Sequence, residues 1–208
     1  ERFFPSLQDF KPLIIVYANQ QSYKAASQHL PENALAHYDR SRRAIHVSVD
    51  AEPEVWQHEM SHLYLDELSD DMPFWFQEGL ARLLQNYNTK RPPCSEQSIL
   101  PEFRTWVEKN PDALYMETLN LPEGIDFMAP GDAARKTVLS GVFVYFLWIN
   151  GDLQAILRGV QENPEADPLF HITYGERGAM EKLRLKYLDF IKRPVFSGAP
   201  GNCRAVQR

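Results

Sequence analysis

The stretch WQHEMSHLYLDELSDDMPFWFQEGLARLL, which runs from Trp56 to Leu84, decides the organisation of this chain. Its segment SDDMP combines short polar residues with a proline, a pattern that ends a helix. We therefore expect one helix from about Pro53 to residue 68 and a second from Pro73 to about residue 87. Pro53 suits the first position of a helix, where its missing N–H group costs no hydrogen bond. So short a connection predicts that the two helices lie antiparallel.

The residues before this helix pair predict strands. PLIIVYA, residues 12–18, is short and rich in β-branched residues, which favours a buried strand. Residues 34–50 predict a hairpin with a turn at 39–42, and its second strand, residues 44–49, alternates between two faces. One face carries Ile45, Val47 and Val49, and the other carries His46 and Ser48. Between the first strand and the hairpin we expect a helix that Pro31 ends.

The residues after the helix pair predict further helices. We expect a strongly apolar helix at 133–150, short helices at 104–109 and 153–161, and an amphipathic helix at 178–191. A chain in which the strands come first and the helices come afterwards is typical of an α+β fold. In this fold a small N-terminal mixed sheet packs on the helix that carries the two histidines, and a mainly helical C-terminal half comes after it. We expect a single domain of two subdomains, residues 1–70 and 71–208.

Composition excludes two classes of function. The chain has 208 residues and a net charge of −6, which argues against a nucleic-acid-binding protein with a basic face. Its longest apolar run, VFVYFLWI from Val142 to Ile149, is too short to span a membrane and predicts a buried helix.

The two cysteines, Cys94 and Cys203, allow either a disulfide or two buried thiols. In the chain-entropy model a disulfide that closes a loop of roughly 100 residues contributes about 4–5 kcal/mol. The chain begins at Glu1 without an apolar leader, so we expect a mature form or an otherwise shortened chain. Both features favour the bacterial periplasm or exterior, with the cytoplasm as the alternative.

The histidines and glutamates of the opening stretch have the spacing of a metal site. His58 and His62 are four residues apart, so they lie on one face of the helix, where two neutral imidazoles can bind one zinc ion. Glu59 lies roughly 100° round the helix from His58, where it can reach a water on the open side of the metal. Two ligands and one general base are the arrangement of zinc-assisted hydrolysis. The best candidate for the third ligand is Glu78, on the second helix.

A bare H-E-x-x-H motif also arises by chance, and its histidines are then surface residues of an acidic helix. Here the motif comes after an alternating strand, has apolar neighbours and precedes a helix with a matching glutamate, which favours the metal site. Gly79, beside Glu78, removes a side chain where two helices approach closely, and Trp75 and Leu80 are expected to pack the pair.

HEMSH followed by PFWFQEGLA resembles the gluzincin branch of zinc metallopeptidases, where H-E-x-x-H precedes a helix of the form W-x-x-E-G-x-A. The chain is most similar to the small bacterial peptidase-MA-like group. The strand LIIVYA, the hairpin, and the segments SGVFVYFLWINGDLQAIL and HITYGERGAMEKLRLKYLDFI also look like the layout of that group. The likeness covers about three quarters of the chain, although only the central motifs are specific.

The resemblance implies a zincin-like fold with one zinc ion held by His58, His62 and Glu78. It implies that Glu59 is the general base, which takes a proton from the attacking water and delivers it to the leaving amine. These enzymes often add a tyrosine or histidine that stabilises the oxyanion. In this chain the candidates are Tyr145, His171 and Tyr174, and each of them has packing or another structural role as its alternative.

The resemblance also implies that an extended polypeptide substrate lies along a strand of the hairpin, at the rim of the cleft. His37 and His46 belong to this hairpin and are expected to be ordinary surface residues instead of ligands. Asp66, one turn after His62, either orients an imidazole through a hydrogen bond or is a solvated carboxylate at the end of the helix.

These observations are compatible with three functions. The first is a zinc-dependent peptidase. The second is a zinc-stabilised binding module without turnover. The third is a latent peptidase blocked by its own tail, residues 197–208, and in a variant of this idea a cysteine thiolate binds the zinc. The sequence indicates neither the cleavage preference nor the oligomeric state.

Overall fold

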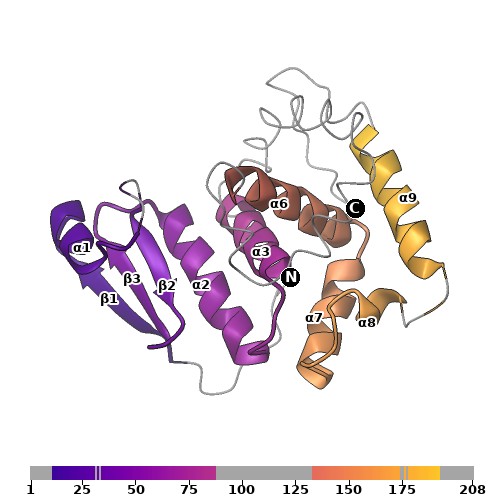
Figure 1. Ribbon diagram of the computed structural model, residues 1–208, viewed down its shortest axis with the longest axis horizontal. Coiled ribbons are helices and arrows are strands. Elements are labelled where there is room, and N and C mark those ends of the chain that lie inside the picture. Colours follow the sequence, from indigo (N-terminus) through magenta and orange to yellow (C-terminus); the bar gives the residue numbers. More distant parts are fainter. Residues whose placement is uncertain are drawn as a thin grey trace.

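The computed structural model describes residues 11–30, 32, 34–87, 133–173, 176 and 178–192. The described part is an α+β structure with a three-stranded sheet and seven helices (Figure 1). The sheet and helix α1 lie at one end, helices α7, α8 and α9 lie at the other, and α2, α3 and α6 lie between them.

The sheet contains β1 (Leu13–Tyr17), β2 (Ala36–Asp39) and β3 (Ala44–Ser48) in the order β1-β3-β2. Strand β1 is parallel to β3, and β2 is antiparallel to β3, which confirms the expected hairpin. In the turn, Asp39 accepts hydrogen bonds from the hydroxyl of Ser41 and the amide of Arg42, as short polar residues do in tight turns.

The prediction of a buried first strand was wrong. Leu13 is 54% exposed and Val16 is 53% exposed, because β1 is an edge strand and α2 packs against β2 and β3. The expected core face of the hairpin is right for Ile45 and Val47, which are fully buried. It is wrong for Val49, which lies beyond the end of β3 and is 58% exposed.

Helix α1 (Gln20–Ala26) packs against β1 and β3. It begins at a capping box, in which the side chain of Asn19 accepts from the amide of Ser22 and the hydroxyl of Ser22 accepts from the amide of Asn19. The helix ends at Ala26, several residues before the proline that was expected to end it.

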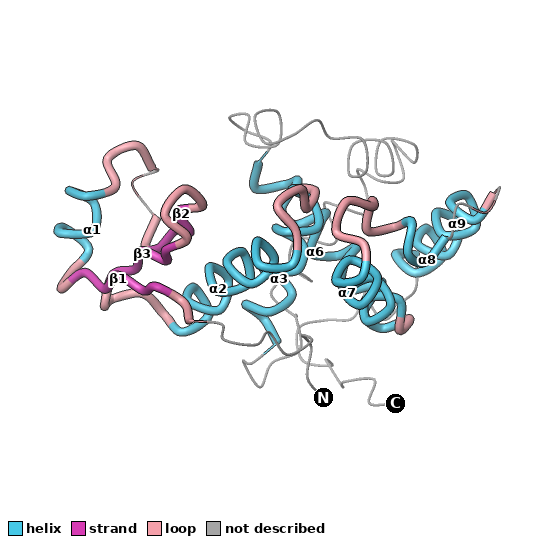
Figure 2. Tube along the Cα trace, turned by 90° about the horizontal axis from the view of Figure 1, so that it is seen from below, coloured by secondary structure: helices cyan, strands magenta, loops and turns pink. Residues whose placement is uncertain are grey.

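Helices α2 (Pro53–Leu68) and α3 (Phe74–Tyr87) form the expected pair, and both boundaries of α2 agree with the sequence prediction. Figure 2 shows α2 between the sheet on one side and α3 and α6 on the other. Leu63 of α2 belongs to the apolar cluster under the sheet, whereas Tyr64 and Leu65 belong to the larger cluster with α3 and α6. Because α2 is buried on two sides, only a narrow stripe of its surface is left for polar groups.

The larger apolar cluster continues into the C-terminal helices. Helix α6 (Ala133–Ile149) packs along α3, and its Val142, Phe143 and Leu147 are buried, as the apolar run predicted. Helices α7 (Asp152–Glu162) and α9 (Ala179–Lys192) lie within one residue of their expected bounds. The short helix α8 (Phe170–Thr173) had not been expected, and the predicted helix at 104–109 lies outside the described residues.

Within the described residues, no single helix has the length and apolar composition needed to cross a membrane. Residues 139–149 of α6 and all of α7 meet the length and composition criterion only as a pair, and that pair is bent by 99°.

Candidate metal centre

The H-E-x-x-H segment lies on α2, where the helix period brings His58 and His62 together. Their ring centroids are 4.9 Å apart, and the ring planes are inclined by 72°. The spacing of four residues places both imidazoles on the same side of the helix, one turn apart. Both side chains are largely buried, with 18% of His58 and 11% of His62 exposed.

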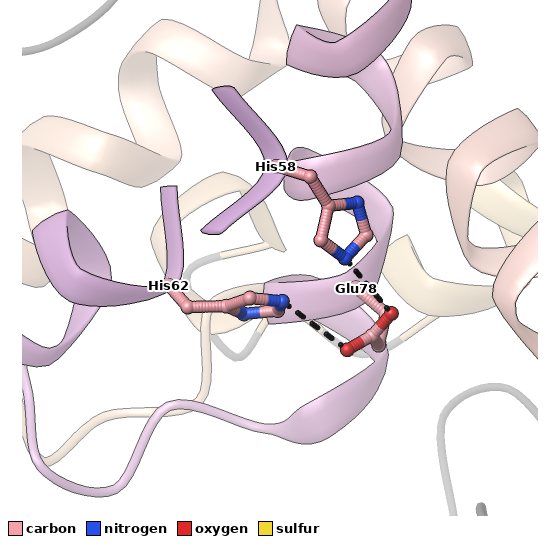
Figure 3. Close-up of side chains that lie close together, drawn as sticks. All are labelled: His58, His62 and Glu78. Atoms are coloured by element: carbon pink, nitrogen blue, oxygen red, sulfur yellow. Dashed lines mark ion pairs between the residues drawn. The ribbon is translucent and has the colours of Figure 1, made fainter. Parts of the chain in front are cut away.

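Glu78 of α3 completes the group (Figure 3). Its Oε1 lies 3.3 Å from Nε2 of His62, and its Oε2 lies 3.7 Å from Nε2 of His58. One ligand atom from each of the three residues lies within 4.8 Å of the other two. Within the part of the chain that the structure describes, no other group of three such side chains meets this criterion.

These distances fit a metal ion of zinc's size. With bonds of about 2.0–2.1 Å and tetrahedral angles, two ligand atoms of one zinc ion are about 3.3–3.4 Å apart. The separation of Glu78 from His62 agrees with that value, and its separation from His58 is only slightly longer. Two imidazoles and one carboxylate also leave a fourth position for a water molecule or a substrate.

The electrostatics of the group favour a cation. Burial is the main cause that lowers the pKa of His58 to about 4 and that of His62 to about 3. Both rings are therefore neutral at pH 7, which is the form that binds a metal ion. Because both rings are neutral, the contacts of Glu78 with them are not ordinary salt bridges.

Glu59 lies beside this group. Burial and the nearby charge of Glu78 raise its pKa to about 8, and burial raises the pKa of Glu78 itself to about 7. Two carboxylates with raised pKa values in one site are mutually repulsive without a cation. A divalent ion would stabilise both ionised forms. The backbone amide of Tyr38, in β2, faces the Glu59 carboxylate and acts to lower its pKa.

Two further residues of α3 interact with the group, and the sequence interpretation missed both. The side chain of Gln85 forms a hydrogen bond with His58, and the positive charge of Arg82 acts on both His58 and Glu78. Arg82 and Gln85 come after Glu78 by one and two turns of the same helix. That helical spacing is the signal that could have identified them.

Gly79 does stand at a close approach of two helices, but the neighbour is α6. A Cβ at this position would lie 2.5 Å from Cγ2 of Val144 and 2.6 Å from the backbone oxygen of Ser140. The expected packing residues Trp75 and Leu80 are buried in the same cluster as Val144. The absence of a side chain at Gly79 therefore lets α3 lie against α6, which fixes the position of the neighbouring Glu78.

Asp66 is largely buried and binds the hairpin. Its Oδ2 accepts a hydrogen bond of 2.8 Å from the hydroxyl of Tyr38, and its Oδ1 pairs with Nε of Arg40 at 3.1 Å. The alternative of a solvated carboxylate is therefore wrong, because only 7% of Asp66 is exposed. Its role in orienting an imidazole stays a prediction.

The three oxyanion candidates have different surroundings. Tyr145 is on α6, and its ring lies 5.8 Å from that of Trp148 and 6.2 Å from that of Phe190. These contacts agree with the alternative role of Tyr145 in packing. His171 is on α8 and packs tightly against Gly159 of α7. Tyr174 lies outside the described residues, and so do Cys94, Cys203 and the tail. A role in catalysis stays a prediction for all three candidates.

The histidines of the hairpin form a separate cluster on the sheet face towards α1. His37 and His46 are opposite each other in the register, and their rings stack at 4.7 Å. Tyr23 shares a hydrogen bond of 3.0 Å with Nδ1 of His37, and Tyr17 shares one of 2.8 Å with Nδ1 of His46. His29 contacts the edge of the His37 ring. The cluster is therefore part of the packing between α1 and the sheet. The expectation of a surface residue was wrong for His46, which is only 5% exposed because α1 covers this face.

Comparison with models of known protein families, with curated proteins and with solved structures gave no match. The likeness to gluzincins therefore rests on the motifs themselves. The structure adds that His58, His62 and Glu78 lie together and that Glu59 lies beside them.

Proposed function

We propose that this chain is a zinc-dependent peptidase of the gluzincin type, with a zincin-like fold. The observation that carries the proposal is the closeness of three side chains that could bind a metal, His58, His62 and Glu78. Beside them lies a second carboxyl group, that of Glu59, which is not needed as a ligand. A site that serves structure alone would be closed by four protein ligands. Three ligands with a neighbouring carboxylate are what hydrolysis requires.

Zinc bound here would polarise a substrate carbonyl and lower the pKa of a coordinated water towards neutrality. The other tasks belong to residues of the chain. Glu59 accepts the proton of the attacking water, because it lies beside the three ligands and is not needed to bind the ion. The protonated Glu59 then donates to the nitrogen of the leaving amine, so that one carboxyl group handles both proton transfers.

The position of β2 at the end of the described sheet is compatible with a polypeptide substrate. Strand β2 is an edge strand of the described sheet, and the backbone amide of its Tyr38 faces Glu59. An extended peptide that lies along this edge would place its carbonyl groups near the general base. Pairing through the main chain gives affinity with little sequence selectivity.

The test is cleavage of casein or a peptide library by the purified protein, before and after chelation and zinc return. We expect cleavage that chelation abolishes and zinc restores. Glu59→Gln keeps the size of the side chain but removes the base, so zinc should still bind while cleavage falls on the order of 100-fold or more. The matched control is Glu54→Gln, five residues earlier on α2, which should cleave as the wild type does.

The same assay separates the peptidase from a zinc-stabilised binding module. Stoichiometric zinc without any cleavage that depends on Glu59 would favour the binding module. Absence of bound zinc would contradict both proposals.

A further inference from the structure

Tyr38 contacts the helix of the metal site at two separate points. In the antiparallel pair β2–β3, the amide of Ser48 donates to the oxygen of Leu35, so residues 35 and 48 form a hydrogen-bonded pair. Pairs alternate along an antiparallel ladder, so the pair Tyr38–Ile45 is of the other type. The backbone groups of Tyr38 therefore point away from β3, towards α2, where its amide faces Glu59 and acts to lower the pKa of that carboxyl group.

The side chain of Tyr38 reaches the second point. Its ring packs with the apolar cluster between the sheet and α2, and its hydroxyl donates to Asp66 at 2.8 Å. Glu59 and Asp66 are seven residues apart, which is two turns and about 10 Å along one face of the helix. Tyr38 therefore lies along α2, with its amide at Glu59 and its hydroxyl at the buried carboxylate of Asp66.

The contact at Asp66 is held by more than one interaction. The side chain of Asp66 is 5% exposed, and it is held by Arg40 of the hairpin as well as by Tyr38. A second ion pair, Arg43 with Glu67, joins the hairpin to the same end of α2. Hydrogen bonds to a charged, buried acceptor are among the stronger ones in proteins, so this end of the hairpin is a fixed reference for the strand.

We propose that Tyr38 is a positioning residue for Glu59, and that its bond to Asp66 fixes where its amide holds the carboxylate of the general base. This inference rests on the proposed peptidase function. The amide constrains Glu59 only while β2 keeps its place along α2. The hydroxyl sets that place, since it is the far end of the same residue. Loss of the hydroxyl lets the strand shift, and the Glu59 carboxylate moves with it.

The test is Tyr38→Phe, which keeps the ring and removes only the anchor. We expect kcat to fall on the order of 10–100-fold, because small misplacement of a catalytic group is costly. Zinc affinity should stay within about 2-fold of the wild type, because none of the three ligands is changed. The control is Tyr17→Phe, which removes a hydroxyl that bonds to His46 at the same distance of 2.8 Å. It should leave kcat unchanged.

Asp66 provides a second pair of variants. Asp66→Ala removes the acceptor and should reproduce the loss of kcat, whereas Asp66→Asn keeps an acceptor oxygen and should retain most of it. Unchanged kcat in both Tyr38→Phe and Asp66→Ala would overturn the proposal. An equal fall in the Tyr17→Phe control would do so too, because the effect would then be general to the sheet.

A further readout does not need activity. Hydrogen exchange of the Tyr38 amide should be slow in the wild type and faster in both Tyr38→Phe and Asp66→Ala. If the wild type cleaves no peptide, the peptidase function fails, but the exchange rates still decide whether the hydroxyl holds the amide on Glu59. Equal exchange rates in the wild type and both variants would overturn the positioning role.

Discussion

Oε1 of Glu78 lies 3.3 Å from Nε2 of His62, although the two residues belong to different helices. The contact joins a carboxylate to a buried ring whose lowered pKa keeps it neutral at pH 7. Such a pair gains little from mutual attraction and loses hydration on both sides. A cation that binds both atoms would remove this cost, so the relationship between these residues is the central reason to expect a metal ion.

Metal content is the first prediction. The purified protein should contain about one zinc ion per chain, and Glu78→Ala should lose it because two imidazoles alone form an incomplete ligand set. Elemental analysis after gel filtration measures the ratio. Glu162→Ala, at an exposed glutamate of α7, is the control and should keep its zinc. Equal zinc in the Glu78 and Glu162 variants would remove Glu78 from the ligand set.

Zinc should also stabilise the fold. An ion that binds the folded chain and not the unfolded one adds about 2.7 kcal/mol when its free concentration is 100 times its Kd. We therefore expect chelation to lower the Tm and zinc to restore it, as measured by thermal unfolding monitored by circular dichroism. Glu59→Gln should show the same rise with zinc, since that residue is not a ligand. A similar rise in Glu78→Ala would contradict the proposed site.

Gly79 should tolerate no larger residue. In Gly79→Ala the new methyl group meets the backbone oxygen of Ser140 at 2.6 Å, and a backbone atom cannot rotate away. Overpacking of this kind costs about 1–3 kcal/mol, and the better helix propensity of alanine offsets about 1 kcal/mol of that. We expect a lower Tm and weaker zinc binding, because Glu78 is the next residue.

The control for this variant is Lys182→Ala, at an exposed position of α9, which should leave both quantities unchanged. A Tm of Gly79→Ala equal to that of the wild type would mean that α3 and α6 can move apart at no cost.

The histidine cluster should make the sheet sensitive to acid. Burial lowers the pKa of His37, and the neighbours His46 and His29 lower it further, while Asp39 acts in the opposite direction. Burial likewise lowers the pKa of His46. The charge of Asp39 raises this pKa, and the charge of Arg42 lowers it. Below the ordinary histidine pKa of about 6.5, the unfolded chain therefore binds more protons than the folded chain. Stability should fall as the pH decreases below that value, by at most about 1.4 kcal/mol per pH unit for each residue.

Urea unfolding of the metal-free protein at several pH values between about 5 and 8 measures this dependence. The double variant His37→Gln and His46→Gln should lose less stability between neutral and acidic pH than the wild type. The comparison uses the change with pH, because the substitutions also alter stability at neutral pH. The same change with pH in both proteins would show that these rings do not carry the acid sensitivity.

Local signals explain which parts of the fold could be predicted. Pro53 and the polar SDDMP segment influence only the few residues around them. These two local signals determined both ends of α2. The hairpin was equally local, because alternation and the turn at Asp39 depend on adjacent residues. Burial of β1 was predicted wrongly because exposure depends on the order of strands, and an apolar run cannot indicate that it will lie at an edge.

The sequence by itself determined the pair of candidate metal ligands, because a spacing of four residues places His58 and His62 on one face of any helix. It also indicated Glu78, since a short turn brings the next helix back. Only the tertiary structure decided the rest. It showed that Gly79 packs against α6 and that Tyr38 joins Glu59 to Asp66. Those contacts link segments far apart in the chain, and their geometry depends on how sheet and helices pack, which no local pattern of residues encodes.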